Sequence, residues 1–270
     1  MVEADDRAFM TRALFLAERG RGRTTPNPVV GAVVVTTRGV VVGQGAHLRA
    51  GGPHAEVVAL DAAGDRARGA TIYCTLEPCC HQGRTGPCVE RIVQAGIARV
   101  VVATIDPNPR VAGAGLAFLR ARGLDVAEGV CADPARRQNA PFFTWVTEAR
   151  PFVLLKAAVS QDGFVGRPDH RVVLTGARAN QFFQQQRAGV DAIAVGAGTV
   201  LVDDPQLTAR GAYRDRPLTR VLFDWRGRIP VTARVFSTLA GGPVIMVVSA
   251  AAAEAGAARV AEFERRGVIV

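Results

Sequence analysis

Hydrophobic and polar positions alternate between helical and strand patterns along the first half of the chain. Residues 5–19 carry apolar positions such as Leu14 and Leu16 among charges, which predicts a helix that Gly20 ends. The pattern then predicts strands at 29–35, 39–42, 71–75, 98–104 and 124–126, and helices at 54–63, 87–95 and 115–122. Strands that alternate with helices indicate an α/β layered fold.

A loop that contains Asn139 and Pro141 separates this pattern from a second one, and 270 residues are enough for two domains. We predict domains at 1–146 and 151–270. The second pattern predicts strands at 152–159, 192–196, 220–224 and 243–249, helices at 177–187 and 250–266, and the start of a strand at 268–270.

No apolar run has the length of a transmembrane helix, and no signal peptide is visible at the N-terminus. We therefore expect a cytoplasmic protein that does not bind membranes. Five cysteines in such a chain indicate thiols or metal ligands and not a disulfide framework.

The formal charge of +9 raises the question of nucleic-acid binding. The basic residues, however, are spread along the chain without a block of like charges or interleaved aromatic residues. All but one of the 33 basic residues are arginine, the exception being Lys156. A phosphorylated small molecule suits this basic surface better than a nucleic acid, which we do not expect as a partner.

A candidate zinc site combines His54 and Glu56 at a predicted helix start with Cys79 after Pro78 and Cys88 at the next predicted helix start. A catalytic zinc ion needs three protein ligands and one open position for water, which one histidine and two cysteines supply. A carboxylate must then carry a proton from that water to the leaving amine. We therefore predict His54, Cys79 and Cys88 as ligands and Glu56 as the proton carrier.

Each of these residues is a weak signal alone, because a lone cysteine is usually a small buried hydrophobic residue. Their conjunction matches the H-x-E…P-C-x-x-C signature of zinc deaminases, except that eight residues separate Cys79 from Cys88. This spacing inserts a loop beside the metal. Cys74 is expected in the core, Cys80 has no expected role beside its ligand neighbour, and no role is evident for His47.

Across nearly its whole length the sequence resembles the bifunctional deaminase–reductases of riboflavin biosynthesis. Four stretches carry the resemblance: residues 26–31 (PNPVVG), 54–56 (HAE), 75–88 (TLEPC through GRT to PC) and 156–163 (KAAVSQDG). The long loop between the cysteines is typical of that family, and cytidine and tRNA deaminases lack it. The resemblance implies a cytidine-deaminase-like three-layer α/β/α domain followed by a partial dihydrofolate-reductase-like α/β domain.

The resemblance also implies two reactions. A zinc-dependent domain removes an amino group from a diaminopyrimidinone with a phosphoribosylamino chain, and a second domain then reduces the ribosyl chain with NADPH. In the first domain it implies that Asn27 hydrogen-bonds the pyrimidine edge. It implies that Arg84 pairs with the substrate phosphate in a bidentate manner and that Thr85 donates a hydroxyl.

In the second domain the resemblance implies two sets of contacts. NADPH would contact Ala158, Thr199 and Asp203, and the substrate would contact Lys156, Arg187, Leu207 and Arg210. The family continues beyond the residue that matches Val270 into a strand and a Glu-Gly-Gly turn that binds substrate and cofactor phosphate. Because the given sequence does not include this turn, we expect it to deaminate but to reduce poorly.

Two other hypotheses remain open at this point. One is a zinc nucleoside or tRNA deaminase with a C-terminal binding module, and the other is a non-enzymatic zinc-stabilised domain. The loop between the cysteines argues against the first, and Glu56 argues against the second, because a closed structural zinc site needs no acid–base residue. We expect a homo-oligomer.

Overall fold

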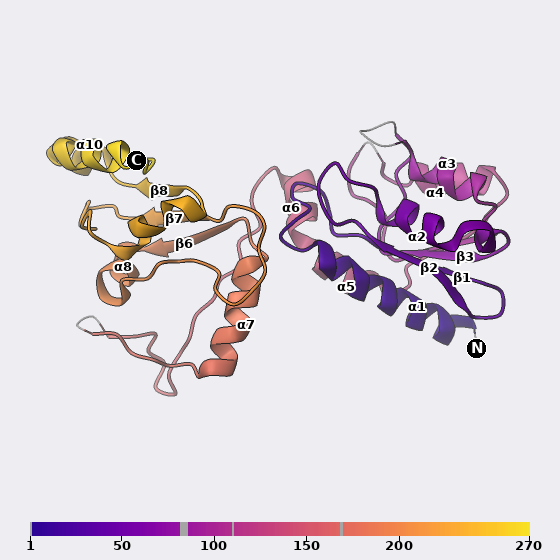
Figure 1. The fold of residues 1–270 in the computed structure, drawn as a ribbon, viewed down its shortest axis with the longest axis horizontal. Helices are drawn as coiled ribbons and strands as arrows, with labels where there is room; N and C mark the ends of the chain where they lie inside the picture. Colours follow the sequence, from indigo (N-terminus) through magenta and orange to yellow (C-terminus); the bar gives the residue numbers. More distant parts are fainter. Residues whose placement is uncertain (1, 82–85, 110, 168–169) are drawn as a thin grey trace. The chain divides into compact units, whose positions relative to one another are not determined.

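The computed structural model describes residues 2–81, 86–109, 111–167 and 170–270, with the side chains of residues 2–4 excepted (Figure 1). The chain forms two compact units, Met1–Leu154 and Leu155–Val270, which we call unit 1 and unit 2. Each unit is described by itself below.

Unit 1 is built on a five-stranded sheet with the strand order β2-β1-β3-β4-β5. Strand β1 is antiparallel to both β2 and β3, whereas β4 runs parallel to β3 and β5 runs parallel to β4. The central strands are rich in valine and isoleucine and are buried on both faces, which is typical of such sheets. The strands are β1 (Gly31–Val35), β2 (Val41–Ala46), β3 (Thr71–Cys74), β4 (Arg99–Val102) and β5 (Asp125–Glu128).

Helices cover both faces of this sheet, as Figure 1 shows, so that unit 1 has the expected three α/β/α layers. One apolar core joins the sheet to α2 (Ala55–Ala63), α3 (Cys88–Gln94) and α4 (Ala114–Ala121). A second core joins the opposite face to α1 (Val2–Ala17) and α5 (Ala132–Gln138). Two short 3-10 segments, η1 (Glu18–Gly20) and η2 (Gly64–Ala67), follow α1 and α2.

Helix α2 lies unusually close to strand β2, because the facing positions of the strand are glycines. A Cβ atom at Gly43 would lie 2.0 Å from the carbonyl oxygen of Ala59, and one at Gly45 would lie 2.3 Å from that of Ala55. Only glycine allows this approach. The contact fixes the N-terminus of α2, which carries His54 and Glu56.

The predicted loop around Asn139 is wrong, because α5 and α6 (Ala140–Glu148) occupy most of it. Pro141 suggested a loop, but it lies in the first turn of α6, where a missing N–H costs nothing. Asn139 is buried between the two helices. Its side chain accepts a hydrogen bond from the N–H of Val29 at 2.9 Å and donates one to the carbonyl of Val29 at 2.9 Å.

Unit 2 contains a three-stranded parallel sheet with the order β6-β7-β8. Its apolar core lies between this sheet and the helical segments that follow the strands. The strands are β6 (Ala192–Gly196), β7 (Thr219–Phe223) and β8 (Val244–Val247). The helices are α7 (Ala177–Ala188), α8 (Ala197–Asp203), α9 (Ala250–Ala255) and α10 (Ala257–Arg265), with a 3-10 segment η3 (Arg234–Gly241).

The strand predicted at 152–159 does not form. A strand needs hydrogen-bonding partners, and no strand of the described residues pairs with this segment, whose Leu155 side chain is 88% exposed. The helix predicted at 250–266 is divided at Gly256 into α9 and α10. The strand start predicted at 268–270 is present as a parallel bridge between Ile269 and Ile245.

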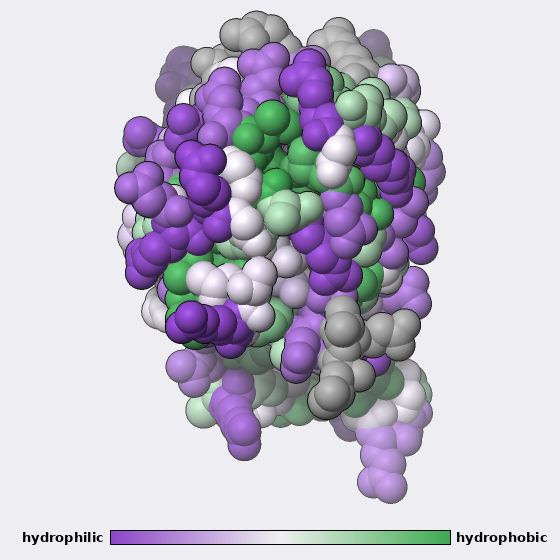
Figure 2. Space-filling model, turned by 90° about the vertical axis from the view of Figure 1, so that its right-hand side faces the viewer, coloured by the Kyte–Doolittle hydropathy of each residue, from purple (hydrophilic) through white to green (hydrophobic). Residues whose placement is uncertain are grey.

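Within the described part of the chain, no helix is long and apolar enough to cross a membrane. The face in Figure 2 mixes large hydrophilic areas with smaller hydrophobic ones.

Candidate metal centre and active site

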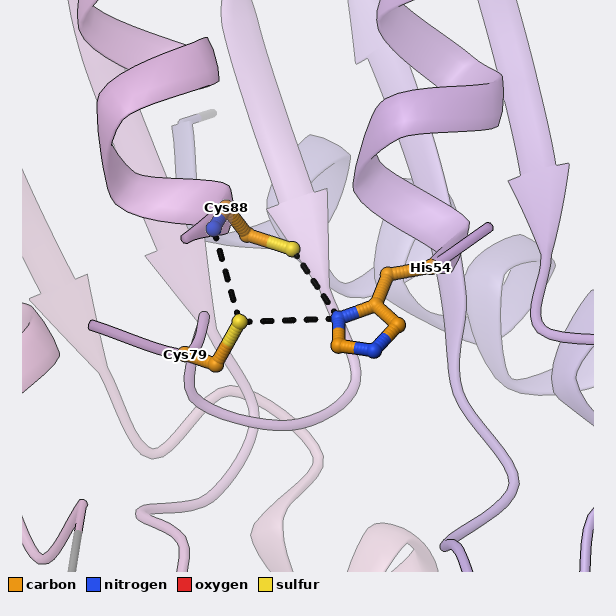
Figure 3. A group of neighbouring side chains, drawn as sticks. All are labelled: His54, Cys79 and Cys88. Carbon is orange, nitrogen blue, oxygen red and sulfur yellow. Dashed lines mark hydrogen bonds between the residues drawn. The ribbon is translucent and has the colours of Figure 1, made fainter. Parts of the chain in front are cut away.

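Three elements of unit 1 bring the predicted zinc ligands together. His54 is the N-cap residue of α2, Cys79 lies in the loop after β3, and Cys88 is the first residue of α3. Figure 3 shows the three side chains pointing toward one another. Both cysteines belong to the connection between β3 and α3, which places them beyond the carboxyl end of β3.

The ligand atoms have the spacing that a metal ion requires. The Nδ1 atom of His54 lies 3.2 Å from the Sγ of Cys88 and 3.5 Å from the Sγ of Cys79. The three ligand atoms all lie within 4.8 Å of one another. Zinc binds thiolate at about 2.3 Å and imidazole nitrogen at about 2.0–2.1 Å, so one ion can contact all three atoms. The donor set of one nitrogen and two sulfurs therefore fits zinc.

The two thiols interact strongly with each other. A hydrogen bond with Cys88 lowers the pKa of Cys79, and the same interaction raises the pKa of Cys88. The backbone N–H of Cys88 also donates to the sulfur of Cys79 at 3.4 Å. Without a cation only one of the two sulfurs readily carries the negative charge, and a divalent ion would stabilise both thiolates.

Glu56 lies on the first turn of α2 beside this cluster, and its side chain is buried. Burial raises the pKa of its carboxyl to about 7. The oxygen Oε2 has no hydrogen-bond partner among the described residues. A buried carboxyl oxygen without a partner beside three metal ligands is suited to bind a water molecule or a substrate nitrogen. A general acid–base group works best when its pKa is near neutral pH.

Glu77, two residues before Cys79, holds the cysteine loop in place. Its buried carboxylate accepts hydrogen bonds from the backbone N–H groups of Asp106 at 3.1 Å, Gly113 at 2.9 Å and Gly115 at 2.9 Å. These bonds join the segment after β3 to the segment after β4 and to the start of α4. The sequence marked this glutamate only as part of a motif and gave it no role.

His47, for which sequence reasoning found no role, links Asn27 to the metal cluster. The Nδ2 of Asn27 lies 3.2 Å from Nε2 of His47, and Nδ1 of His47 lies 3.0 Å from the carbonyl oxygen of Pro53. The ring of His47 also meets the ring of His54 edge-on, at 5.4 Å between centroids. Burial lowers the pKa of His47, which favours its neutral form.

Asp106 is a further buried residue near the cysteine loop that sequence reasoning missed. It follows β4 in a Pro- and Asn-containing loop, is buried, and accepts a hydrogen bond from the N–H of Asn108 at 2.8 Å. Burial raises the pKa of Asp106 to about 6, and Cys79 and His81 are among the groups that act on it electrostatically. The only signal in the sequence was an acidic residue directly after a buried strand. The predicted substrate contacts Arg84 and Thr85 lie outside the described residues.

In unit 2 the predicted substrate and cofactor residues lie on different segments. The Lys156 ammonium lies 4.4 Å from the ring centre of Phe183 on α7, a cation–π contact. Ala158 belongs to the same extended segment as Lys156 and is half-buried. Thr199 lies within α8, and Asp203 is the last residue of that helix.

Helix α7 and the loop after α8 bring the other three predicted substrate residues of unit 2 close together. Arg187 donates a hydrogen bond to the carbonyl of Thr208 at 3.1 Å, and the N–H of Arg210 donates to the side chain of Gln184 at 2.9 Å. Burial, together with the positive charge of Arg210, lowers the pKa of Arg187. Leu207 is buried in the same loop. Two arginines on facing segments are a suitable arrangement for an anionic group.

Two family models match the chain. Residues 3–104 match the cytidine and deoxycytidylate deaminase zinc-binding region, and residues 151–268 match the RibD C-terminal domain. The first match contains all three candidate metal ligands. The second covers the sheet of unit 2, which is therefore of the dihydrofolate-reductase-like class.

Curated relatives extend over both units. The riboflavin biosynthesis protein RibD of Aquifex aeolicus is 44% identical over 88% of this chain and 67% of its own length. The RibD protein of Escherichia coli is 42% identical over 85% of this chain and 66% of its own length. The chain thus spans about two thirds of the length of these relatives.

Solved structures agree with these matches. Acinetobacter baumannii RibD is 39% identical with a TM-score of 0.81, and the match covers 99% of this chain and 73% of that one. The diaminohydroxyphosphoribosylaminopyrimidine deaminase/5-amino-6-(5-phosphoribosylamino)uracil reductase of Thermotoga maritima is 36% identical with a TM-score of 0.83, over 99% of this chain and 80% of that one. With these identities over both units and a His-Cys-Cys metal centre in the first, the chain belongs to the RibD family of bifunctional deaminase–reductases.

Proposed function

We propose that the chain catalyses zinc-dependent hydrolytic deamination of 2,5-diamino-6-(phosphoribosylamino)pyrimidin-4-one, as a step of riboflavin biosynthesis. The observation that carries this proposal is the buried, unpartnered oxygen of Glu56 beside three metal-ligand atoms. The names of the relatives, which describe riboflavin biosynthesis proteins and a pyrimidine deaminase/reductase, support the choice of substrate. We assign deamination to residues 1–146 and reduction to residues 151–270.

The reaction replaces a C–NH₂ group by C=O and releases ammonia. When bound by His54, Cys79 and Cys88, zinc supplies the Lewis acidity that lowers the pKa of a water molecule to about 7. Glu56 takes a proton from the attacking water at Oε2 and delivers it to the amino nitrogen that leaves. Its burial keeps bulk water away from this proton and holds its pKa near the value that such a transfer needs.

Substrate contacts complete the proposed deaminase site. Asn27 hydrogen-bonds the edge of the pyrimidine ring, and its proximity to His47 and hence to His54 supports this role. Arg84 binds the substrate phosphate as a bidentate partner, and Thr85 donates a hydroxyl to the substrate. An Arg84→Ala variant should therefore lose activity on the phosphorylated substrate but not on a dephosphorylated analogue.

The test is ammonia release from the purified pyrimidine substrate by the zinc-loaded chain. Glu56→Gln keeps the size of the side chain but cannot carry the proton, and general acid–base groups contribute about 10²–10⁴-fold. We expect a loss of that order with the zinc content unchanged. The matched control is Glu90→Gln, a change at an exposed glutamate of α3 that should leave activity unaltered. Wild-type rates from Glu56→Gln would refute the proposed mechanism.

We further propose that unit 2 binds NADPH and the deaminated product, for reduction of the ribosyl chain. The match to the RibD C-terminal domain supports this role. Ala158, Thr199 and Asp203 would contact NADPH, and the proximity of Arg187 to Arg210 suits a phosphate group of the substrate. The test is NADPH oxidation with the deaminated pyrimidine as substrate, and an absence of oxidation would contradict this role.

A tRNA deaminase was the alternative function suggested by the charge. The similarity of the chain to RibD proteins over both units supports the pyrimidine substrate instead. A gel-shift assay with tRNA separates the two, because the proposed function predicts no complex. The homo-oligomeric state stays a prediction, which size-exclusion chromatography with light scattering would test.

A further inference from the structure

His47 lies at the end of β2, buried between two segments that serve the candidate active site. Its backbone N–H donates to the carbonyl of Val30 at 2.9 Å. Its own carbonyl lies so close to Gly20 that a Cβ atom at that glycine would be 2.4 Å from the oxygen. The backbone of His47 is therefore held on two sides.

The two ring nitrogens of His47 have partners that define the position of the proton. The carbonyl oxygen of Pro53 lies 3.0 Å from Nδ1 and can only accept a hydrogen bond, so Nδ1 carries the hydrogen. In the neutral ring Nε2 is then an acceptor. Its neighbour at 3.2 Å is the amide of Asn27, which must donate from Nδ2.

This chain of hydrogen bonds determines which way the Asn27 amide faces. With Nδ2 engaged by His47, the oxygen Oδ1 is the atom left to meet the substrate. An aminopyrimidine presents N–H groups along its edge, and a carbonyl oxygen is the partner that they need. If the amide were rotated by half a turn, it would present N–H to N–H, and both donors would lose hydrogen bonds on burial.

We propose that His47 is a positioning residue for deamination. It orients Asn27 so that Oδ1 accepts from an N–H of the pyrimidine, and through Pro53 it joins this orientation to the turn that carries His54. The substrate-binding amide and the metal ligand are thereby fixed relative to each other by one imidazole ring. This inference rests on the proposed function of the site and adds a residue that acts through Asn27 without contact with the reacting atoms.

The test is a double-mutant cycle on ammonia release. His47→Asn keeps an N–H donor for Pro53 but removes the acceptor for Asn27. Since a small misplacement of a substrate-positioning group can cost about 10²-fold, we expect a 10- to 100-fold fall in kcat/KM with zinc content unchanged. His170→Asn, a change at an exposed histidine of unit 2, is the control and should have no effect.

The cycle separates positioning from a direct role of His47. Asn27→Ala should lose at least as much activity as His47→Asn, and the double variant should be no worse than Asn27→Ala alone. Losses that multiply would show that His47 acts independently of Asn27, which would overturn the proposal. An unchanged rate in His47→Asn would overturn it as well.

A measurement on the ring itself is independent of activity. The chain has four histidines, so nitrogen NMR of the histidine-labelled, zinc-loaded protein can be assigned by single substitutions. We expect the proton of His47 on Nδ1, both in the wild type and in Asn27→Ala. A proton on Nε2 would overturn the proposal even in an active enzyme. If the wild-type protein released no ammonia while His47 showed the expected tautomer, only the proposed function would fail.

Discussion

The two units of the chain bury their apolar residues to different extents. Unit 1 has a core on each face of a five-stranded sheet, with helices over both. Unit 2 has one core on a three-stranded sheet, and its segment 155–165 exposes several large apolar side chains, with Leu155 at 88% and Val165 at 70%. An apolar run therefore becomes a buried strand only where neighbouring strands are present to pair with it.

The largest expected difference between the units concerns zinc. Cys88→Ser removes one of three ligands, so we expect the zinc content to fall from about one ion per chain to almost none and deamination to be lost. Because all ligands lie in unit 1, thermal unfolding reported by Trp145 should shift to lower temperature, while that reported by Trp225 in unit 2 should not. Single-tryptophan variants distinguish the two signals. An equal shift in both units would mean that they unfold together.

Backbone hydrogen exchange directly compares the paired strands β3 and β4 with the unpaired segment 152–159. Amides of β3 and β4 are in a buried ladder and should exchange only on global opening, whereas amides of 152–159 should exchange almost as in an unfolded chain. Since global stabilities are about 5–15 kcal/mol, the protection factors should differ by more than about 10³-fold. Protection of 152–159 equal to that of β4 would show that another strand covers this segment.

A smaller effect is expected from the ion pair that attaches α1 to the sheet of unit 1. The Arg99 guanidinium donates to both carboxylate oxygens of Asp6 at 2.8 Å, and the Tyr73 hydroxyl donates to one of them at 2.7 Å. Asp6→Asn should cost about 1.5–3 kcal/mol in the free energy of unfolding at neutral pH. Asp133→Asn, a change at an exposed aspartate, is the control.

The same ion pair predicts a pH dependence. Hydrogen bonding to Arg99 lowers the pKa of Asp6 in the folded state. Its contribution to stability is therefore fully present above the unfolded-state pKa of about 3.9 and is lost as the pH falls through the lower folded-state value. The difference between wild type and Asp6→Asn should be constant near pH 7 and should shrink below about pH 4. A constant difference across both ranges would contradict this account.

The smallest effect is expected at Lys156, which contacts α7 in unit 2. Its ammonium over the Phe183 ring should contribute only about 0.5–1 kcal/mol at an exposed position. Chemical denaturation of Lys156→Met should reveal at most this loss, and Lys156→Arg should restore it. A loss of several kcal/mol would show that the segment is an integral part of the fold of unit 2.

The zinc ligands could be predicted from sequence because the chemistry requires few residue types at recognisable positions. His54 and Glu56 at one helix start, and Cys88 at another, mark positions that depend mainly on local structure. The alternating strands and helices of unit 1 were predictable for the same reason, because each depends on a periodic pattern within a few residues.

Features that depend on distant parts of the chain could not be predicted. Gly43 and Gly45 lie beyond the strand predicted at 39–42, and nothing in the local sequence indicates that Gly45 is needed because the backbone of α2 passes over it. The role of His47 depends on Asn27 and Pro53, which only the fold brings to the two sides of its ring. The segment 152–159 has the composition of a strand, but its composition does not show whether another strand lies beside it to form hydrogen bonds.

The two hydrogen bonds between the side chain of Asn139 and the backbone of Val29 have a consequence for synthesis on the ribosome. Domains fold as units while the chain emerges from its N-terminus. All three zinc ligands have been synthesised by residue 88, but the backbone of Val29, two residues after Asn27, has its final partners only when residue 139 has emerged. The metal ligands of a nascent chain can therefore come together before the segment around Asn27 is fixed. The proposed active site is complete only after Asn139, the residue that follows α5, has been translated.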